Sequence, residues 1–342
     1  MGNYLVTFKP QGPYFFGNEK SFAFPGANSD KVGSDYYAKS ELIPTQSTVV
    51  GVFRYIFLPV KKGFGEYTAE DLATNAKAVG ERSFQYGACS NKFGVIKSIS
   101  PVFIMQGEEK LIPTPMDHTE GDVDTYTPFS DYAPCGDEDG RIYPTAYNAK
   151  NGVAHSYVRV SDKRIFKTSD IFATTTRVGI NRANKKEGFF KKDHVIMKNG
   201  FSFGVYLELD DAVVPQNTVA FMGQGKSTFT VKFTEVGANA WSDLANSIGA
   251  MLQTGVVYCM SDAFITSDIY GKAKFAVTEL RDYRAYGVNG EGKVTKSSTL
   301  YKLIKAGSVF VSDTAEGAEV IQDFIKDDSV ADAGYNCTVK RA

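Results

Sequence analysis

Alternating apolar residues recur in both halves of this 342-residue chain, and amphipathic helical segments lie between the alternating runs. Residues 201–209 carry an apolar side chain at every second position, which is typical of a strand with one buried face. Residues 49–57 instead place apolar side chains three and four positions apart, as a helix buried along one side does. Because strand and helix periods alternate along the chain, we predict an α+β fold.

The order of the expected elements repeats once along the chain. Two passes through a strand–helix–strand–strand–helix–strand order predict two ferredoxin-like (RRM-like, split β-α-β) domains with loop insertions. We expect helices at residues 47–57, 72–84, 241–252 and 318–325, and strands at residues 4–8, 95–96, 102–105, 111–112, 157–160, 201–209, 229–236, 256–265, 273–280 and 308–311.

The length also favours two domains, because single hydrophobic cores stop growing at about 250–300 residues. We place the first ferredoxin-like domain at residues 1–198 and the second at residues 199–342. The first carries an acidic insertion at about residues 107–140 and a basic loop segment at about residues 150–198. The second carries a glycine-rich loop.

Charge is distributed very unevenly, although the net charge is only −1. Residues 107–140 contain ten acids and one base, a local charge of −9, and we expect a surface insertion there. Residues 150–198 contain twelve bases and four acids, a local charge of +8, with few periodic apolar positions, so we expect an extended, loop-rich segment. The basic segment points to an anionic partner.

Several classes of protein are excluded or disfavoured. No apolar run reaches the length of a membrane span, and the first residues enter a strand-like pattern directly, so we expect a cytoplasmic protein without a membrane partner. The four cysteines never form Cys-x-x-Cys, which argues against a zinc site. The three histidines lack a catalytic motif around them, and we expect no catalytic residues, metal or cofactor.

Residues 220–227 read Ala-Phe-Met-Gly-Gln-Gly-Lys-Ser, a loosened form of the phosphate-binding P-loop. A P-loop is followed by a helix, whereas the next residues, 228–234, alternate as a strand does. We therefore expect a glycine-rich turn between two strands. Gly223 and Gly225 would let such a turn approach a nucleic-acid backbone, and Lys226 would supply charge.

The basic residues at 176–192 are interleaved with glycine and phenylalanine. Cations neutralise phosphates and aromatic faces stack on bases, so this segment suits single-stranded nucleic acid. A solvated basic loop explains the same composition equally well. The helix start near Ser47 also has two interpretations. It is either an exposed helix end that binds phosphate or the capped end of a core helix, and the second is the more common.

Several short motifs occur in order along the chain. They are a Phe-containing loop (residues 17–25), a Pro-x-x-Ser-Thr helix start ending in Arg54 (43–54), a Pro-x-Pro-x-Asp segment (113–117), an Arg-x-Gly-Ile element (177–180), a glycine-rich loop (223–226) and a closing Gly-Ser-Val-aromatic strand (307–310). Taken together, these segments resemble the RAMP superfamily of CRISPR-associated proteins, most closely the family of third subunits of the type III-B Cmr effector complex in the Cas-five-like group. The type III-A counterpart family is the nearest alternative.

This resemblance implies a noncatalytic subunit of an RNA-guided antiviral ribonucleoprotein complex. It would bind the 5′ handle of CRISPR RNA, dock on the large polymerase-like Cmr subunit and contact the backbone-filament subunit. The implied RNA-binding residues, matched by position, are Ser47, Thr48, Arg54, Arg177, Gly179, Arg182, Lys185, Lys186, Gly223, Gly225 and Lys226.

Two alternatives remain open. A RAMP endoribonuclease that processes precursor CRISPR RNA usually needs a general base, often a histidine in the first domain. The first histidine of this chain is His118, which counts against that activity. A subunit that contacts only proteins is the other alternative.

Overall fold

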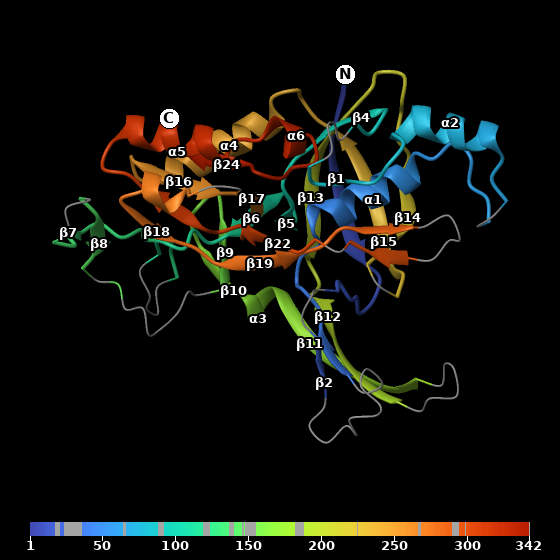
Figure 1. Cartoon of the computed structure of the whole chain (residues 1–342), viewed down its shortest axis with the longest axis horizontal. Helices are drawn as coiled ribbons and strands as arrows, with labels where there is room; N and C mark the ends of the chain where they lie inside the picture. The colour runs from blue at the N-terminus through green and yellow to red at the C-terminus, as the bar shows by residue number, and fades with distance from the viewer. Residues whose placement is uncertain are drawn as a thin grey trace.

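The computed structural model confirms an α+β protein with several antiparallel sheets. Figure 1 shows most of the helices along the upper side of the molecule and one long ribbon that projects from its lower side. The structure describes residues 1–17, 21–23, 36–63, 66–87, 92–118, 124–136, 140–145, 147, 155–181, 188–223, 225–265, 268–288, 294–297 and 299–341.

A nine-stranded sheet forms the centre of the molecule, in the order β10-β9-β6-β5-β13-β1-β15-β14, with β4 also paired to β13. The N-terminal strand β1 lies inside it, between β13 and β15. The strands are β1 (Gly2–Pro10), β4 (Ile96–Ile99), β5 (Phe103–Gln106), β6 (Glu109–Pro113), β9 (Ser156–Arg159), β10 (Ile165–Lys167), β13 (Phe201–Leu209), β14 (Thr218–Met222) and β15 (Ser227–Glu235).

Helix α1 (Gln46–Ile56) packs against this sheet, as the apolar spacing predicts. Thr45 is its N-cap, and the Thr45 side chain accepts a hydrogen bond from the Thr48 amide. Phe53 is fully buried, and its ring lies 5.5 Å from the ring of Phe8 on β1. Helix α2 (Ala69–Val79) starts and ends earlier than predicted, because Thr68 forms its capping box and Gly80, with φ of 80°, follows its last residue.

Two further sheets belong to the C-terminal part of the chain, with strand orders β18-β23-β16-β24 and β17-β22-β19. Helix α5 contacts β16, β23 and β24, and all residues of β16 are buried. These elements are α4 (Ala240–Met251), β16 (Val256–Cys259), β17 (Ala263–Phe264), η4 (Tyr270–Lys272), β18 (Phe275–Val277), β19 (Leu280–Tyr283), β20 (Tyr286–Val288), β21 (Val294–Lys296), β22 (Tyr301–Ile304), β23 (Val309–Val311), α5 (Ala315–Ile325), α6 (Asp328–Ala331) and β24 (Thr338–Lys340).

The paired ferredoxin-like domains and their division near residue 198 stay predictions. Two sets of four neighbouring strands, β5-β13-β1-β15 and β18-β23-β16-β24, share one arrangement. In each set, the strand that comes first in the sequence lies in space between the strands that come third and fourth in the sequence. Strands from either side of residue 198 nevertheless pair directly, because β13 and β15 flank β1. The central sheet is therefore built from both segments of the predicted division.

The described residues of the basic segment form mostly strands, so the prediction of a loop-rich segment is wrong for that part of the chain. After the short strands β9 and β10 and helix α3 (Thr168–Ile171), it forms the long antiparallel pair β11 (Phe172–Asn181) and β12 (Gly188–Met197). Strand β12 also pairs in parallel with β3 (Tyr36–Lys39), and β3 pairs with β2 (Ser21–Ala23). Much of this ribbon is exposed on both faces, so its sequence lacks the apolar alternation of a half-buried strand.

The acidic segment is only partly a surface insertion. It contains the whole of β6 and the hairpin strand β7 (Tyr132–Pro134), which pairs with β8 (Ile142–Pro144) just beyond it. Asp117 contradicts the prediction of a surface location, because it is fully buried. The Tyr126 hydroxyl donates to Asp117 Oδ1 at 2.8 Å, whereas Oδ2 has no hydrogen-bond partner within the described part of the chain. Burial raises the pKa of Asp117 to about 6.

Within the described ranges, no helix has both the length and the apolar character that a membrane crossing requires.

Replacing Asp117 should change how stability depends on pH. The raised pKa means that the folded chain keeps this proton at pH values where the unfolded chain loses it, so wild-type stability falls as pH rises from about 4 to 6. We expect Asp117→Asn, which cannot ionise, to reduce this fall by about 3 kcal/mol. Urea unfolding of both proteins at several pH values measures the difference, and parallel pH profiles would contradict the assignment.

Candidate nucleic-acid interface

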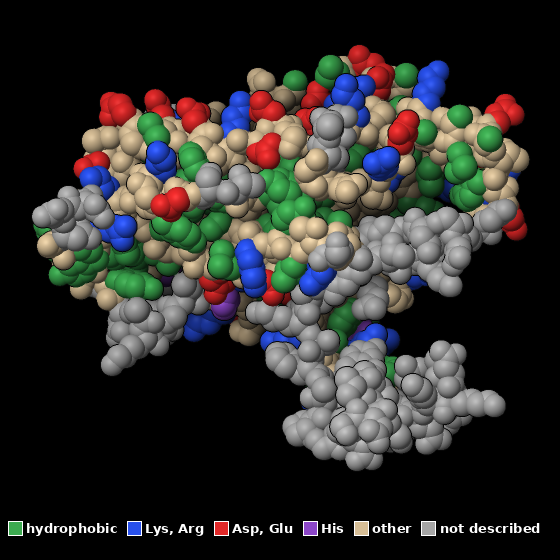
Figure 2. Space-filling model, viewed as in Figure 1, with side chains coloured by type: hydrophobic (Ala, Val, Ile, Leu, Met, Phe, Trp, Pro, Cys, Tyr) green, Lys and Arg blue, Asp and Glu red, His purple; other side chains and the backbone are tan. Residues whose placement is uncertain are grey.

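Strands β11 and β12 bring basic residues of the predicted RNA-binding segment onto one ribbon (Figure 1). Their register places Arg177 opposite Lys192 and Gly179 opposite Phe190. Directly opposed residues of an antiparallel pair point to the same face, so these four residues share one face of the ribbon. Arg177 is exposed, and Figure 2 shows Lys and Arg side chains where the ribbon leaves the body.

Cations and aromatic rings alternate along this face. A Cβ added to Gly179 would lie 2.3 Å from Cζ of Phe190, so the Phe190 ring covers the glycine directly. The Lys192 ammonium lies 5.4 Å from the ring centre of Phe190 and 5.4 Å from that of Phe15. The ring of His194, two residues further along the same face, lies 5.3 Å from the ring of Phe15. We call Phe15, Arg177, Phe190, Lys192 and His194 the basic ladder.

The acid in β12 lies on the opposite face. Thr176 and Tyr37 donate hydrogen bonds to the Asp193 carboxylate at 2.6 and 2.5 Å, and these bonds lower the pKa of Asp193. Burial, aided by the positive charges of Arg177 and Lys192, lowers the pKa of His194. The basic ladder therefore carries two cations and a neutral imidazole at pH 7.

The glycine-rich turn lies next to the basic ladder. It joins β14 to β15, and β15 follows it where a P-loop requires a helix, which confirms the predicted turn between strands. Gly223 and Gly225 have φ of 77° and 88°, and a Cβ on Gly223 would lie 2.5 Å from the Phe15 carbonyl oxygen. The turn therefore packs against the same Phe15 whose ring contacts Lys192, and it presents Lys226 exposed to solvent.

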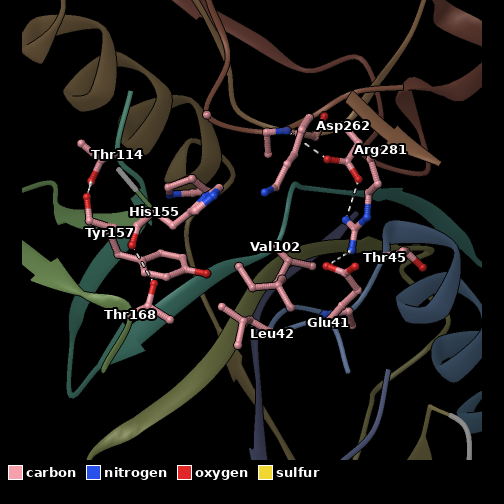
Figure 3. Close-up of a pocket in the computed structure, with 18 of the residues that line it drawn as sticks. Glu41, Leu42, Thr45, Val102, Thr114, His155, Tyr157, Thr168, Asp262 and Arg281 are labelled. Atoms are coloured by element: carbon pink, nitrogen blue, oxygen red, sulfur yellow. Dashed lines mark hydrogen bonds and ion pairs between the residues drawn. The ribbon is translucent and has the colours of Figure 1, made fainter. Parts of the chain in front are cut away.

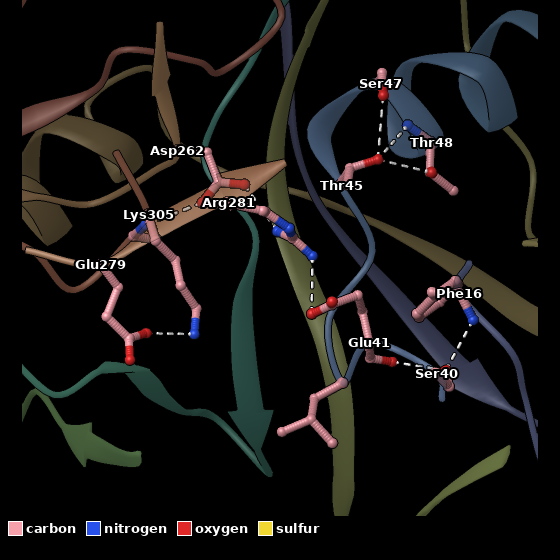
Figure 4. A network of polar contacts seen from close by, with 12 residues as sticks. Phe16, Ser40, Glu41, Thr45, Ser47, Thr48, Asp262, Glu279, Arg281 and Lys305 are labelled. Carbon is pink, nitrogen blue, oxygen red and sulfur yellow. Dashed lines mark hydrogen bonds and ion pairs between the residues drawn. The ribbon is translucent and has the colours of Figure 1, made fainter. Parts of the chain in front are cut away.

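The start of α1 is a capped helix end, which was the more common of the two interpretations. The Ser47 amide donates to the hydroxyl of buried Tyr335 at 3.1 Å, and the Thr48 amide donates to Thr45 Oγ1 at 3.3 Å. Figure 4 shows the Thr45 hydroxyl between Ser47 and Thr48. These amides already have partners inside the protein, so Ser47 and Thr48 have a local structural role.

Arg54 also has a structural role. Its Nε donates to the Val79 carbonyl oxygen, and its two terminal nitrogens donate to Gly80 O and Ser83 Oγ, all at 2.8 Å. The guanidinium therefore caps the C-terminal end of α2, and burial lowers the pKa of Arg54.

The structure thus brings together only part of the predicted set. Arg177 and Gly179 share the ribbon face on which Lys192 contacts Phe15, and Gly225 and Lys226 belong to the same turn as Gly223, which packs against Phe15. Ser47, Thr48 and Arg54 instead lie on α1. Arg182, Lys185 and Lys186 lie outside the described residues. Sequence reasoning missed Phe15, although the aromatic run at residues 14–16 was a visible signal.

A cavity of about 780 Å³ opens beside the root of the ribbon (Figure 3). Its walls come from the segment before α1, from the ends of β6 and β11, and from the C-terminal part of the chain. Leu42, Val102 and Tyr157 form an apolar part of its wall. Among the residues that the structure describes, no group of three His, Cys, Asp or Glu side chains is placed to hold a metal ion.

Ion pairs line one side of this cavity (Figure 4). Arg281, whose side chain is only 17% exposed, lies 2.8 Å from Asp262 and 3.2 Å from Glu41. Asp262 also accepts a hydrogen bond from the Ala306 amide at 2.9 Å. Glu41 belongs to the segment that leads into α1, so Arg281 ties that segment to the C-terminal sheets.

Comparison with known proteins gives a match at the level of structure. No family model matches the sequence, and no curated protein matches it. A chain in the cryo-EM structure of the type III-B Cmr-beta complex bound to cognate target RNA matches with a TM-score of 0.53 and 14% identity, covering 98% of this chain and 96% of that chain.

A second chain, from the type III-B Cmr-beta complex bound to cognate target RNA and AMPPnP, has a TM-score of 0.52 and 12% identity, covering 97% of this chain and 94% of that chain. At such low identity these matches show that the fold is similar over nearly the full length.

Gly223 and Gly225 provide a matched test of the turn. Alanine at either position costs about 1–2 kcal/mol, because both have left-handed backbone angles. Gly223→Ala should cost more than Gly225→Ala, because only at Gly223 does the added Cβ meet backbone. Urea unfolding measures both costs, and equal costs would show that the turn does not pack against Phe15.

Arg281→Met should destabilise the fold by about 3–5 kcal/mol, because it leaves the Asp262 carboxylate, which is only 9% exposed, without the guanidinium that pairs with it. Lys302→Met is the control. Lys302 is a mostly exposed lysine paired with Asp282 on the adjacent strand, and its loss should cost less than about 1 kcal/mol. Chemical denaturation compares the two variants, and similar costs would argue against a structural role for Arg281.

Proposed function

We propose that this chain is a noncatalytic subunit of a type III CRISPR-Cas effector complex of the Cmr kind and binds the 5′ handle of CRISPR RNA. The observation that carries the proposal is the basic ladder beside the glycine-rich turn. The fold similarity to a chain of an RNA-bound Cmr complex supports it. By the sequence resemblance, the chain would also bridge the large polymerase-like subunit and the backbone filament, in the cytoplasm.

The basic ladder has the chemistry that single-stranded RNA requires. Arg177 and Lys192 lie across from each other and can neutralise successive phosphates. Half-buried Phe190 flanks Lys192, and its ring can stack on a base that a single strand leaves unpaired. Phe15 is buried and supports Lys192 from inside the protein. Gly223 and Gly225 lack side chains beside the ladder, so the RNA backbone can approach the turn closely, and Lys226 contributes a further positive charge.

One observation favours the alternative of a RAMP endoribonuclease. His194 lies on the same ribbon face as Arg177 and Lys192, and burial together with these two charges lowers the pKa of His194. A neutral imidazole can act as the general base for attack by a 2′-hydroxyl. His118 has a different position, because its Nδ1 lies 3.2 Å from the Thr127 amide nitrogen and its ring lies 5.8 Å from that of Tyr126. Replacing His194 therefore tests the endoribonuclease hypothesis.

The double variant Arg177→Ala/Lys226→Ala should weaken binding of the handle RNA and flatten its dependence on salt. Removing one cation that neutralises a phosphate of a single strand reduces the slope of log affinity against log salt by about 0.7. Fluorescence anisotropy over a range of salt concentrations measures both effects. Lys302→Ala, which removes an exposed lysine on β22, is the control and should leave the slope unchanged.

Three outcomes separate the candidate functions. An unaltered salt slope and unaltered crosslinking to guide RNA in the double variant would support a subunit that contacts only proteins. Metal-independent cleavage of repeat RNA that is abolished by His194→Ala would establish the endoribonuclease. Binding without cleavage, weakened in the double variant, agrees with the noncatalytic subunit.

A further inference from the structure

The outer face of β1, β15 and β14 forms a second surface, apart from the basic ladder. Helix α1 covers the inner face, where the Phe53 ring lies 5.5 Å from that of Phe8 and 6.4 Å from that of Phe233 (Figure 1). Alternate residues of the three strands point the other way. We call this surface the open face; its residues are Thr7, Lys9, Gln11, Val219, Phe221, Thr228, Thr230, Lys232 and Thr234.

Strand register orders the open face into rows that cross the sheet. Lys9 lies opposite Thr230, which lies opposite Val219. The Gln11 side-chain amide donates to Thr230 Oγ1 at 3.1 Å, which places Gln11 on the same face. A second row pairs Thr228 with Phe221 at the sheet edge. The face therefore combines hydroxyl and amide groups with one aromatic ring.

Exposure and charge define what this face can bind. Phe221 and Val219 are each 55% exposed on β14, the last strand of the sheet. Lys9 and Lys232 are exposed as well, and no acidic side chain lies among the described residues of the open face. A half-exposed aromatic ring on the same sheet face as two exposed lysines is complementary to a partner that is both planar and anionic.

We propose that the open face binds a segment of single-stranded RNA, with one base stacked on Phe221 and phosphates near Lys9 and Lys232. This inference rests on the proposed function and extends the RNA path beyond the basic ladder. The glycine-rich turn connects the two surfaces, because Phe221 immediately precedes Met222, whose pairing with Ser227 closes the turn that carries Lys226. The threonine hydroxyls and the Gln11 amide can hydrogen-bond to base edges and 2′-hydroxyls.

A protein strand added to the edge of β14 is the competing occupant of this surface. Main-chain pairing along β14 would use the backbone of that strand and would gain little from Lys9 and Lys232, which lie on β1 and β15. The spread of lysine and threonine over three strands therefore favours RNA that crosses the face. Separate replacement of Phe221 and Val219 distinguishes RNA from a protein strand, because only the aromatic ring of Phe221 can stack on a base.

The test measures binding of a fluorescein-labelled single-stranded RNA to the full-length chain. Phe221→Ala should weaken binding about tenfold, which is the usual effect of losing one stacked base. Phe221→Trp should restore most of the affinity. Val219→Ala, at a position of equal exposure on the same strand, should change the affinity less than twofold.

Lys9→Gln/Lys232→Gln should flatten the salt dependence of RNA binding. Both Phe221 and Val219 are exposed, and thermal unfolding confirms that the variants fold.

The outcomes distinguish this inference from the proposed function. If Arg177→Ala/Lys226→Ala weakens RNA binding and Phe221→Ala leaves it unchanged, the open face does not bind RNA and the proposed function stands. If wild-type protein binds no single-stranded RNA, both are wrong. If Phe221→Ala and Val219→Ala both release a protein subunit from the assembled complex without changing RNA affinity, the open face docks a protein and the inference is overturned.

Discussion

The ion pairs of Arg281 hold together parts of the chain that are far apart in sequence. Asp262 and Arg281 come from the C-terminal part, whereas Glu41 lies in the segment between the ribbon strand β3 and helix α1. Such a partly buried cation gains from its acids only while the surrounding backbone keeps all three groups in place. The same segment is tied to the residues that follow β1, because the Phe16 amide donates to Ser40 Oγ at 2.9 Å. The root of the ribbon, the cavity and the start of α1 therefore form one connected structure.

Phe15 has a corresponding role on the candidate RNA surface. Its backbone carbonyl oxygen leaves no room for a side chain at Gly223, and its ring contacts Lys192 and His194. The glycine-rich turn and the ribbon are separated by about 30 residues in sequence, and a single buried aromatic residue from the N-terminal segment brings them together. An uncharged residue, Phe15, thus positions the cations of this surface.

The sequence predicts most strongly those elements that have one buried face. The bounds of β13 agree with its alternating apolar residues, and α1 begins directly after its N-cap Thr45. The ribbon was missed because exposed strands need no apolar period, and its order comes from pairing with β3. Local motifs likewise placed the glycine-rich turn correctly, but they could not reveal that Arg54 binds carbonyl groups of α2 or that Asp117 is buried, since both depend on segments that meet only in the folded chain.

The position of β1 inside the central sheet has a consequence for how the protein is made. Both hydrogen-bonded neighbours of this first strand, β13 and β15, are synthesised much later, and the register joins Gly2 to Leu209. During translation the N-terminal strand therefore has neither of its native neighbours until more than half of the chain has left the ribosome. Its apolar side chains stay exposed for that time, and such an unpaired strand is prone to aggregation.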